Sequence, residues 1–320
     1  MVVRILTKME HQFHNWLRSQ THGAASVTNT SITTGIGDDA AVIDFAGQPL
    51  IVTTDAIAEG THFWLPKRES DQGPSRVAAF ERIGRKALAV SLSDIAAMGA
   101  QPVAATLNFQ CPKTLTVEDL KALYNGASKL ATVHGLAIVG GDTNTWQDRL
   151  VVSSTVFGTR SPKQTGWSLD GAKPGDVIYV SGEFGGSIHG RHFDFEPRLA
   201  LAHYLATDYQ VNSATDASDS LTSDLMAIAQ ASGVAMEINL NSVPISPDVQ
   251  ESEDESSLDH ALTDGEDFEL ILTVPPEDAA KLDQAKDLPT PITRLGWVQT
   301  GSPALYDNKG QQITVSGYEH

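Results

Sequence analysis

Carboxylates recur at the edges of apolar segments in the first half of this sequence. Asp55 ends LIVTTDA, Asp94 interrupts SLSDIAAMGA, Asp142 follows two glycines in VGGDTNT, and GIGDDA contains Asp38 and Asp39. Glycine lets backbone approach a ligand closely, and a carboxylate among apolar residues is costly unless it is paired. Hard oxygen ligands of this kind suit Mg²⁺, which proteins hold with a few carboxylates, phosphate oxygens and water. The pattern favours a site for magnesium and phosphate.

Two acidic motifs in the second half extend this pattern. DASDSLTSDL places Asp216, Ser218 and Asp219 ahead of an expected helix, and TDGEDFEL places Glu266 and Asp267 ahead of an expected strand. Each motif alone has a structural interpretation, because a Ser or Asp before a helix is usually a cap and an Asp between glycines is usually a turn. Their repetition over separate segments favours a shared metal site.

Several familiar catalytic motifs are absent from the sequence. It contains no GxxxxGK[ST] phosphate loop, no GxGxxG after a strand, no HExxH and no GxSxG. A nucleotide-binding Walker loop is therefore absent, and neither an HExxH zinc site nor a Ser-His-Asp hydrolase is supported. If the protein performs phosphate chemistry, metal ions and backbone groups must neutralise most of the phosphate charge.

The hydrophobic periodicity predicts alternating strands and helices in both halves. Residues 73–99 have apolar positions three and four apart, and Thr116 is the expected N-cap of a helix over residues 117–134, with Asp119 in the capping-box position. The other expected helices are 197–206, 221–231 and 276–285. The expected strands are 40–45, 49–55, 103–109, 136–139, 150–159, 176–181, 235–240, 268–274 and 292–299, with a hairpin near 307–310.

The alternation indicates an α/β (α+β) fold with two domains. No period of 20 to 50 residues is present, which excludes a solenoid. Pro, Gly and Lys interrupt the pattern between residues 161 and 176. We therefore expect domains at residues 1–160 and 161–320.

Composition and charge exclude several protein classes. The 320 residues are 41% hydrophobic and contain one cysteine, Cys111, so an internal disulfide and a thiolate-caged zinc site are excluded. The net charge of −18 argues against a broad basic face for nucleic acid or an anionic membrane. No apolar run approaches the length of a membrane span, and the start lacks a signal-peptide core, so we expect a cytoplasmic protein.

The negative charge is concentrated in the second half. Residues 1–160 contain 14 acidic and 14 basic side chains, whereas residues 161–320 contain 26 and 8. The segment PDVQESEDESS, residues 247–257, is acidic and free of aromatics, and we interpret it as a mobile surface loop. Neutralising four of its five acids is expected to leave turnover nearly intact; the four are Glu251, Glu253, Asp254 and Glu255.

Taken in order, the motifs resemble those of the thiamine-monophosphate kinase family. The matching segments are GIGDDAAVID, TTDAIAEGTHF, GRKALAVSLSDIAAMGAQP, VGGDTNT, GAKPGDVIYVSG, DASDSLTSDL, DGEDFEL and the terminal GYEH. They extend from residue 35 to the end of the chain. The superfamily also includes aminoimidazole ribonucleotide synthetase (PurM-like proteins), selenophosphate synthetase and the hydrogenase-maturation carbamoyl dehydratase.

The resemblance implies a fold, a reaction and partners. It implies a two-domain PurM-like fold and a homodimer in which the N-terminal domains form a β-barrel-like interface. ATP would bind between the domains with several Mg²⁺ ions, and K⁺ is an additional candidate ion. The reaction would be direct in-line transfer of the ATP γ-phosphoryl group to thiamine monophosphate, the final step of thiamine diphosphate biosynthesis.

The resemblance also assigns site residues by position. The implied metal ligands are Asp39, Thr53, Thr54, Asp55, Asp94, Asp142, Asp216 and Asp219, of which Asp94, Asp142 and Asp219 are also assigned to catalysis. The implied nucleotide contacts are Gly141, Asp142, Arg160, Ser218 and Tyr124. The implied thiamine-side contacts are His62, Glu266 and Tyr318.

Three departures from the family pattern stand out. Ser220 replaces the usual Gly after Asp219, Asp264 adds a carboxylate in TDGED, and GEFGGSIHGRHFDFEPRL is shorter than usual.

Two alternative functions stay open. They are another ATP-using enzyme of the superfamily and a non-catalytic relative that binds nucleotide or metal. The selenophosphate and carbamoyl enzymes are disfavoured because Cys111 is in neither of their catalytic cysteine positions.

Overall fold

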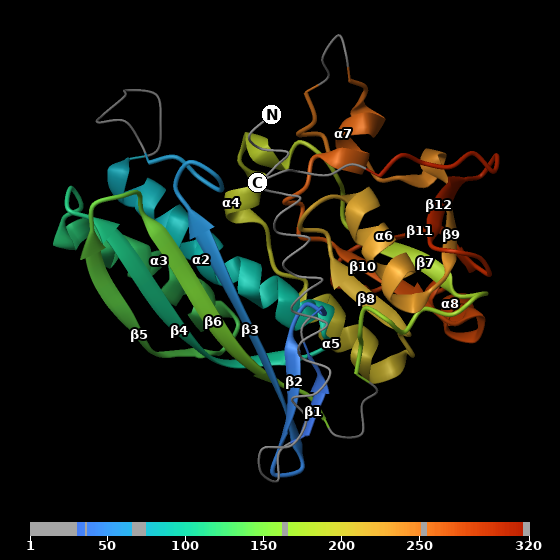
Figure 1. The fold of residues 1–320 in the computed structure, drawn as a ribbon, viewed down its shortest axis with the longest axis horizontal. Coiled ribbons are helices and arrows are strands. Elements are labelled where there is room, and N and C mark those ends of the chain that lie inside the picture. The colour runs from blue at the N-terminus through green and yellow to red at the C-terminus, as the bar shows by residue number, and fades with distance from the viewer. Residues whose placement is uncertain (1–30, 36, 66–74, 162–165, 251–254, 316–320) are drawn as a thin grey trace.

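The structure is a computed structural model that describes residues 31–35, 37–65, 75–161, 166–250 and 255–315 (Figure 1). Tyr318, the GYEH motif and three acids of the acidic segment, Glu251, Glu253 and Asp254, lie outside the described residues. Two six-stranded sheets are present, one from each half of the chain. The mixed α/β class expected from the sequence is confirmed.

The first sheet has the strand order β1-β2-β3-β6-β4-β5. β4 and β5 run parallel, and all other neighbours are antiparallel. The last strand in sequence, β6, thus lies between β3 and β4. The strands are β1 (Ser31–Thr34), β2 (Ala41–Phe45), β3 (Gln48–Ala58), β4 (Gln101–Pro112), β5 (Ala137–Trp146) and β6 (Val151–Thr159).

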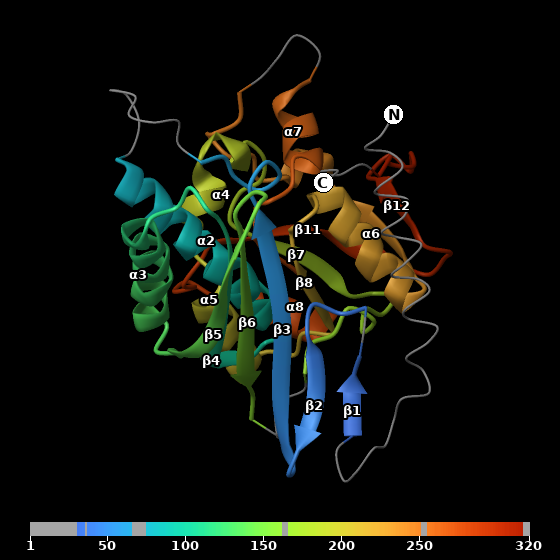
Figure 2. The same cartoon turned by 60° about the vertical axis from the view of Figure 1, so that its left-hand side comes forward.

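Helices α2 (Arg76–Ala97) and α3 (Val117–Val133) pack on one face of this sheet (Figure 2). Thr116 is the N-cap of α3, and Asp119 completes a capping box, as the sequence predicts. The two helices approach closely because each presents a glycine: a Cβ on Gly84 would lie 1.8 Å from the Leu123 carbonyl oxygen, and one on Gly126 would lie 1.8 Å from that of Glu81.

Helix α2 is the central element of the molecule. It packs on the first sheet and on α3, and it also contacts α4, α5 and β8 of the second half. The apolar core therefore continues from Leu88 and Ile95 of α2 into Leu201 of the second half. Neighbouring elements surround α2 on several sides. A charged side chain that points inward from α2 is therefore costly unless it is paired with an opposite charge, hydrogen-bonded or bound to an ion.

The second sheet has the order β12-β9-β11-β7-β10-β8. Its two faces are both buried, since Tyr179 of β7 belongs to the core shared with α2 whereas Val180 belongs to a second core beneath α6. The strands are β7 (Val177–Ser181), β8 (Ser213–Asp216), β9 (Ala235–Ile238), β10 (Leu270–Val274), β11 (Ile292–Gln299) and β12 (Ala304–Asp307).

The helices of the second half are mostly short. The α-helices are α4 (Arg191–Asp194), α5 (Leu199–Asp208), α6 (Leu221–Ser232), α7 (Ser257–Thr263) and α8 (Pro276–Leu282), and the 3-10 helices are η1 (Ser187–His189) and η2 (Leu240–Ser242). Residues 307–310 form the expected turn, although β12 itself pairs in parallel with β9.

Several elements differ from the sequence prediction. The strand expected at 136–139 continues through VGGDTNT to Trp146, because β5 pairs with β4 along its whole length. β1, β8, α4 and α7 were not predicted: β1, β8 and α4 have only four residues each, and polar residues dominate α7. Of the acidic segment, Ser256 and Ser257 belong to the start of α7 rather than to a loop.

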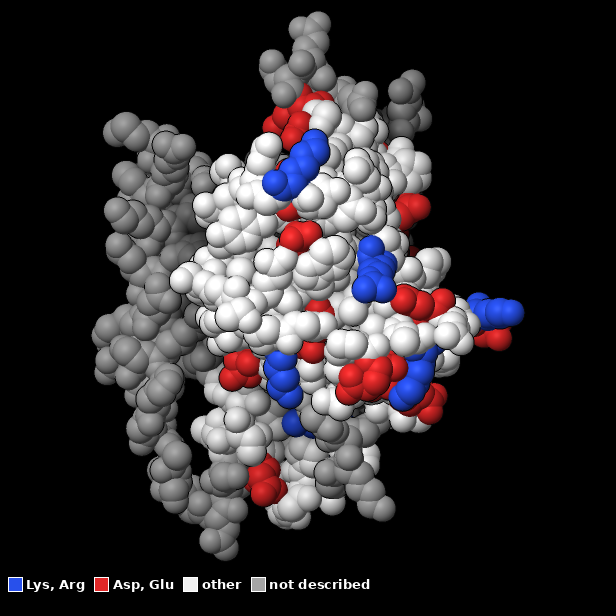
Figure 3. Space-filling view, turned by 90° about the vertical axis from the view of Figure 1, so that its right-hand side faces the viewer, with Lys and Arg blue, Asp and Glu red and all other residues white. Residues whose placement is uncertain are grey.

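On the surface shown in Figure 3, acidic and basic side chains are scattered singly or in small groups. Wide uncharged areas separate them. None of the described helices is both long and apolar enough to cross a bilayer.

Candidate active site at the domain boundary

Three aspartates from distant segments meet between the two halves of the chain. Oxygens of Asp39, Asp94 and Asp216 all lie within 4.8 Å of one another. Asp39 precedes β2, Asp94 lies in the last turns of α2, and Asp216 ends β8. The Thr53 hydroxyl donates a hydrogen bond to Asp94 Oδ2, and the Thr215 hydroxyl donates one to Asp39 Oδ1 at 3.0 Å. We call these three aspartates the carboxylate cluster.

The carboxylate cluster is electrostatically unfavourable without a cation. Burial, followed by repulsion from neighbouring aspartates, raises the pKa of Asp39 and Asp94 well above the ordinary value. Burial raises the pKa of Asp216 to about 7. Asp39 Oδ2 and Asp216 Oδ2 are buried and have no hydrogen-bond partner among the described residues. Unpaired oxygens on converging carboxylates fit a divalent cation, so the donor set agrees with the expected magnesium site.

Asp55 lies beside the cluster on the same sheet face. Its Oδ2 accepts a hydrogen bond of 2.7 Å from the Ser91 hydroxyl of α2, and burial raises its pKa. Thr53, two residues earlier on β3, points to the same face because side chains alternate along a strand. The structure thus brings Thr53 and Asp55 together with the carboxylate cluster.

Asp219 lies in the loop between β8 and α6, close enough to Asp216 for its charge to raise the pKa of that residue. A buried carboxylate, Asp224, holds this loop: its Oδ2 accepts hydrogen bonds of 3.1 Å from the amides of Asp219 and Ser220. The N-cap of α6 is Ser220 rather than Ser218 or Asp219. Capping therefore does not account for the acid in this motif.

The departure at Ser220 causes no backbone strain. Its φ of 177° and ψ of 162° describe extended backbone that any residue adopts. Its hydroxyl accepts a hydrogen bond of 3.0 Å from the Ser223 amide. Serine in place of the usual glycine thus strengthens the start of α6.

Two proposed metal ligands project from the other face of the first sheet. Thr54 is exposed there, with its hydroxyl 3.0 Å from that of Thr155. Asp142 lies on the edge strand β5 and is exposed; its carboxylate accepts from the Thr143 amide and the Asn144 side chain.

Strand pairing measures how far Asp142 is from Asp55. Asp55 pairs with Ser154 of β6, Ser154 pairs with Leu107 of β4, and Leu107 pairs with Gly141 of β5. Three strand spacings place Asp142 roughly 14 Å from Asp55, and alternation turns its side chain away from α2. Within one chain Asp142 therefore lies outside the carboxylate cluster.

The proposed nucleotide contacts are spread over four parts of the chain. Gly141 has φ 150°, and a Cβ there would lie 1.7 Å from the Leu107 carbonyl oxygen, so only glycine fits. Arg160 follows β6 and lies near Asp38. Burial lowers the pKa of Arg160, although the negative charge of Asp38 partly offsets that decrease. Ser218 lies in the loop before α6, whereas Tyr124 is 45% exposed on α3.

A buried lysine joins the two described thiamine-side residues. Lys86 of α2 donates a hydrogen bond of 3.0 Å to the His62 carbonyl oxygen and forms an ion pair of 2.7 Å with Glu266 Oε1. His192 of α4 lies 3.1 Å from Glu266 Oε2. Burial would raise the pKa of Glu266, but His192 and Lys86 outweigh it and lower the pKa to about 2.

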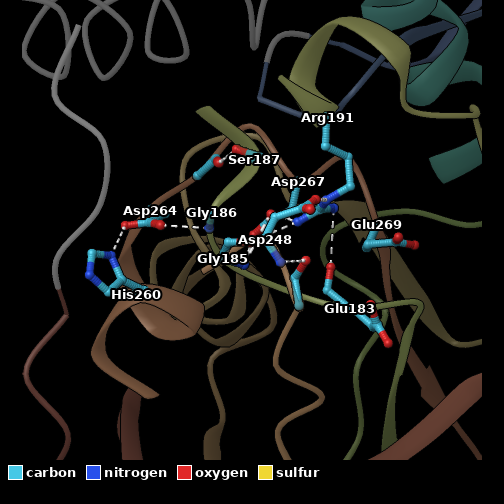
Figure 4. Close-up of polar contacts among 12 residues, drawn as sticks. Glu183, Gly185, Gly186, Ser187, Arg191, Asp248, His260, Asp264, Asp267 and Glu269 are labelled. Atoms are coloured by element: carbon cyan, nitrogen blue, oxygen red, sulfur yellow. Dashed lines mark hydrogen bonds and ion pairs between the residues drawn. The ribbon is translucent and has the colours of Figure 1, made fainter. Parts of the chain in front are cut away.

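The loop that carries Glu266 is fixed by the polar contacts shown in Figure 4. Asp267 accepts hydrogen bonds from the Gly185 amide at 3.1 Å and from Arg191 at 2.9 Å. Asp264, the extra carboxylate of this chain, accepts a hydrogen bond of 2.7 Å from the Gly186 amide and lies 3.0 Å from His260 Nδ1. The shortened glycine-rich segment and the Glu266 loop therefore support each other.

Lys86, His192 and Asp224 were missed by the sequence analysis. Lys86 had a signal: it is a cation within a largely apolar stretch of the expected helix, about two turns before Asp94. His192 and Asp224 had no comparable signal, because a single His or a helix-start Asp is usually structural.

Comparisons with known proteins agree on one family. Residues 37–160 match the family described as AIR synthase related protein, N-terminal domain, and residues 190–307 match AIR synthase related protein, C-terminal domain. The chain is 37% identical to thiamine-monophosphate kinase of Rhodopirellula baltica, covering 98% of this chain and 97% of the relative. It is 34% identical to the Bacillus subtilis protein of the same name, covering 92% and 95%.

Solved structures show the same similarity. The structure of AaThiL complexed with AMPPCP and TMP matches with a TM-score of 0.76 and 26% identity, over 89% of this chain and 91% of that one. Thiamine-monophosphate kinase from Stenotrophomonas maltophilia matches with a TM-score of 0.70 and 30% identity, over 93% and 96%. The hydrogenase maturation protein HypE in complex with ATP matches at 21% identity and TM-score 0.66, which shows the fold alone.

Proposed function

The chain belongs to the thiamine-monophosphate kinases of the AIR synthase related family, and on that premise we propose that it transfers the γ-phosphoryl group of ATP to thiamine monophosphate. The products are thiamine diphosphate and ADP. The observation that carries the proposal is the carboxylate cluster of Asp39, Asp94 and Asp216 at the domain boundary.

The cluster suits a reaction between two polyanions. An attacking phosphate oxygen is already ionised at neutral pH, so the main barriers are positioning and charge repulsion. Asp39, Asp94 and Asp216 would hold Mg²⁺, with Asp55 and Asp219 beside them, and bound Mg²⁺ would neutralise phosphate charge. Hydrogen bonds from the hydroxyls of Thr53, Thr215 and Ser91 hold the carboxylates in place. They are accepted by Asp94, Asp39 and Asp55, respectively.

The transfer is proposed to be direct. A phosphate oxygen of thiamine monophosphate forms a bond to the γ-phosphorus as the bond from that phosphorus to the bridging β-γ oxygen breaks, and ADP leaves with that electron pair. No protein side chain is phosphorylated on this path. A rapid-quench experiment that traps phosphorylated protein at a competent rate would refute the direct path.

The position of Asp142 supports a homodimer. Its carboxylate projects from the sheet face opposite α2, roughly 14 Å from Asp55 of the same chain. We propose that a second chain covers this face and that Asp142 serves the metal site of its partner. The exposed side chains of Val103 and Val139 on β4 and β5 agree with a covered sheet.

Other parts of the assignment are proposed on the same premise. We propose domains at residues 1–160 and 161–320, since the two sheets divide between Thr159 and Val177. Arg160, Ser218, Gly141 and Tyr124 are proposed nucleotide contacts, and K⁺ is an additional candidate ion. The single buried cysteine agrees with a cytoplasmic protein.

The test of the function is a product assay. Pure protein is incubated with ATP, Mg²⁺ and thiamine monophosphate, and thiamine diphosphate is measured beside Asp94→Asn and beside Asp208→Asn, an exposed residue at the end of α5. Product is expected from wild type and Asp208→Asn, with a loss of at least about a hundredfold in Asp94→Asn. Absence of product from wild type, or full activity in Asp94→Asn, would overturn the assignment.

The alternatives are less well supported. An enzyme that uses a cysteine nucleophile needs a reactive thiol, whereas Cys111 is buried in β4 and burial raises its pKa. A non-catalytic relative that binds metal would keep the same carboxylate cluster, and the product assay separates it from a kinase.

A further inference from the structure

Lys86 is the most enclosed cationic side chain of α2, with none of its surface exposed. Its Nζ lies 3.0 Å from the His62 carbonyl oxygen, 2.7 Å from Glu266 Oε1 and 2.7 Å from His192 Nδ1. An ammonium group has three N–H donors, and here each has one neighbour from a different segment. Lys86 therefore connects three parts of the chain at one point.

Two of these segments carry proposed thiamine contacts. His62 follows β3 in the first half, and its Nδ1 accepts a hydrogen bond of 3.0 Å from the Ala58 amide. Glu266 lies between α7 and β10 in the second half. The side chain of Lys86 spans the domain boundary between them, so the separation of the two contacts depends on this lysine.

Glu266 itself is held in an unusual backbone conformation. Its φ of 53° lies in the left-handed region, which non-glycine residues rarely adopt without support. Its amide donates a hydrogen bond of 2.8 Å to the Ser218 carbonyl oxygen, and its carboxylate contacts Lys86 and His192. These contacts fix the carboxylate in one direction next to the loop of the proposed nucleotide contact Ser218.

We propose that Lys86 is a positioning residue for substrate binding: it holds the Glu266 carboxylate and the His62 loop in register across the domain boundary. The proposal rests on the proposed function, because it takes His62 and Glu266 as contacts of thiamine monophosphate. It differs from a structural role, because the loss of a purely structural ion pair would weaken folding and both substrates alike.

Arg85 provides a matched control on the same helix. It also crosses the domain boundary, with Nη1 3.1 Å from the Phe193 carbonyl oxygen and Nη2 3.2 Å from Glu196. Its partners belong to the segment around α4 and do not include Glu266 or His62. Arg85→Gln therefore removes an inter-domain cation without touching the proposed thiamine contacts.

The experiment measures the binding of thiamine monophosphate and of the ATP analogue separately. For Lys86→Met and Arg85→Gln, the KM for thiamine monophosphate and kcat are measured by product formation, and the Kd of the ATP analogue AMPPCP is measured by calorimetry. Lys86→Met is expected to raise the KM for thiamine monophosphate about a hundredfold and to leave the Kd of AMPPCP within about threefold. Arg85→Gln is expected to change both by less than about threefold.

A second pair of variants covers a failure of Lys86→Met to fold. Glu266→Gln is compared with a double variant that combines Lys86→Met and Glu266→Gln. The double variant removes both charges of the Lys86–Glu266 ion pair, so neither is left buried without its partner. Because Lys86 acts mainly through Glu266, the double variant is expected to raise the KM for thiamine monophosphate over that of Glu266→Gln by less than about tenfold, and this remaining effect passes through the His62 loop.

The outcomes are distinguishable. An unchanged KM in Lys86→Met, an equal loss of AMPPCP binding, or a further loss of more than about tenfold in the double variant would overturn the role of Lys86. Wild-type protein that forms no thiamine diphosphate would instead overturn the proposed function.

Discussion

Asp94 of α2 and Asp216 at the end of β8 approach each other from different halves of the chain, with carboxylate oxygens within 4.8 Å. Burial of both groups raises their pKa, and repulsion by neighbouring carboxylates adds to the effect. The domain boundary is therefore destabilised locally when no cation is bound. Folding and metal binding must be linked at this point.

The first prediction concerns Asp94→Asn. Asparagine removes one negative charge from the cluster, so the free energy of unfolding of the metal-free protein at pH 8 is expected to rise by about 1–3 kcal/mol. Stabilisation by added Mg²⁺ is expected to disappear. Urea denaturation with EDTA and with Mg²⁺ measures both effects, and Asp208→Asn should match wild type. Lower stability of metal-free Asp94→Asn would contradict the interpretation of the cluster.

The second prediction concerns pH. A carboxyl whose pKa is raised in the folded state contributes stability that is complete below its unfolded pKa of 3.8 and is lost as pH rises through its folded pKa. For Asp216 the loss spans about pH 4 to 7, at about 1.4 kcal/mol per pH unit. The metal-free protein should thus unfold more easily at pH 7 than at pH 5. Asp216→Asn should flatten this dependence, and a dependence unchanged from wild type would count against it.

The sequence predicted the cluster members and a shared metal site, but not which of the acids lie together. Asp39, Asp94 and Asp216 were identified because acids at apolar edges stand out, and the structure places them together. Asp142 was identified by the same criterion, yet it lies across the sheet. The reason is topological: β6 lies between β3 and β4, and no local pattern encodes the order of strands.

Lys86 illustrates a second limit. Its partners His62, His192 and Glu266 come from three separate segments, and only the packing of α2 against α4 brings them together. The apolar stretch around Lys86 indicates that this side chain is turned inward, but helix periodicity cannot identify its partners. Long helices and the capping box at Thr116 were predictable because their signals are local.

The third prediction uses hybrid dimers to test the position of Asp142. Asp94→Asn and Asp142→Asn chains carrying different tags are coexpressed, and dimers with both tags are purified. If Asp142 serves the partner's metal site, each hybrid has one intact site and one doubly altered site, so about half of wild-type activity returns. If Asp142 acts within its own chain, hybrids stay as inactive as either parent. Full activity of Asp142→Asn alone would remove Asp142 from the site.

The fourth prediction concerns the crossing of α2 and α3, which sets the direction of the helix that carries Lys86 and Asp94. Alanine in place of Gly84 improves helix propensity by about 1 kcal/mol. Its Cβ, however, would lie 1.8 Å from the Leu123 carbonyl oxygen, and a backbone atom moves only if the helices separate. Overpacking costs about 1–3 kcal/mol or more, so the clash outweighs the propensity and Gly84→Ala should unfold at lower urea.

Gly126 provides the reciprocal test of this crossing. Its added Cβ would lie 1.8 Å from the Glu81 carbonyl oxygen. Because both substitutions force the same separation of α2 and α3, the double variant should lose less stability than the two single losses together. Gly35→Ala, whose Cβ would meet only an Ile32 methyl at 4.0 Å, is the control and should stay within about 0.5 kcal/mol of wild type. An unaltered urea midpoint for Gly84→Ala would show that the helices are not packed this closely.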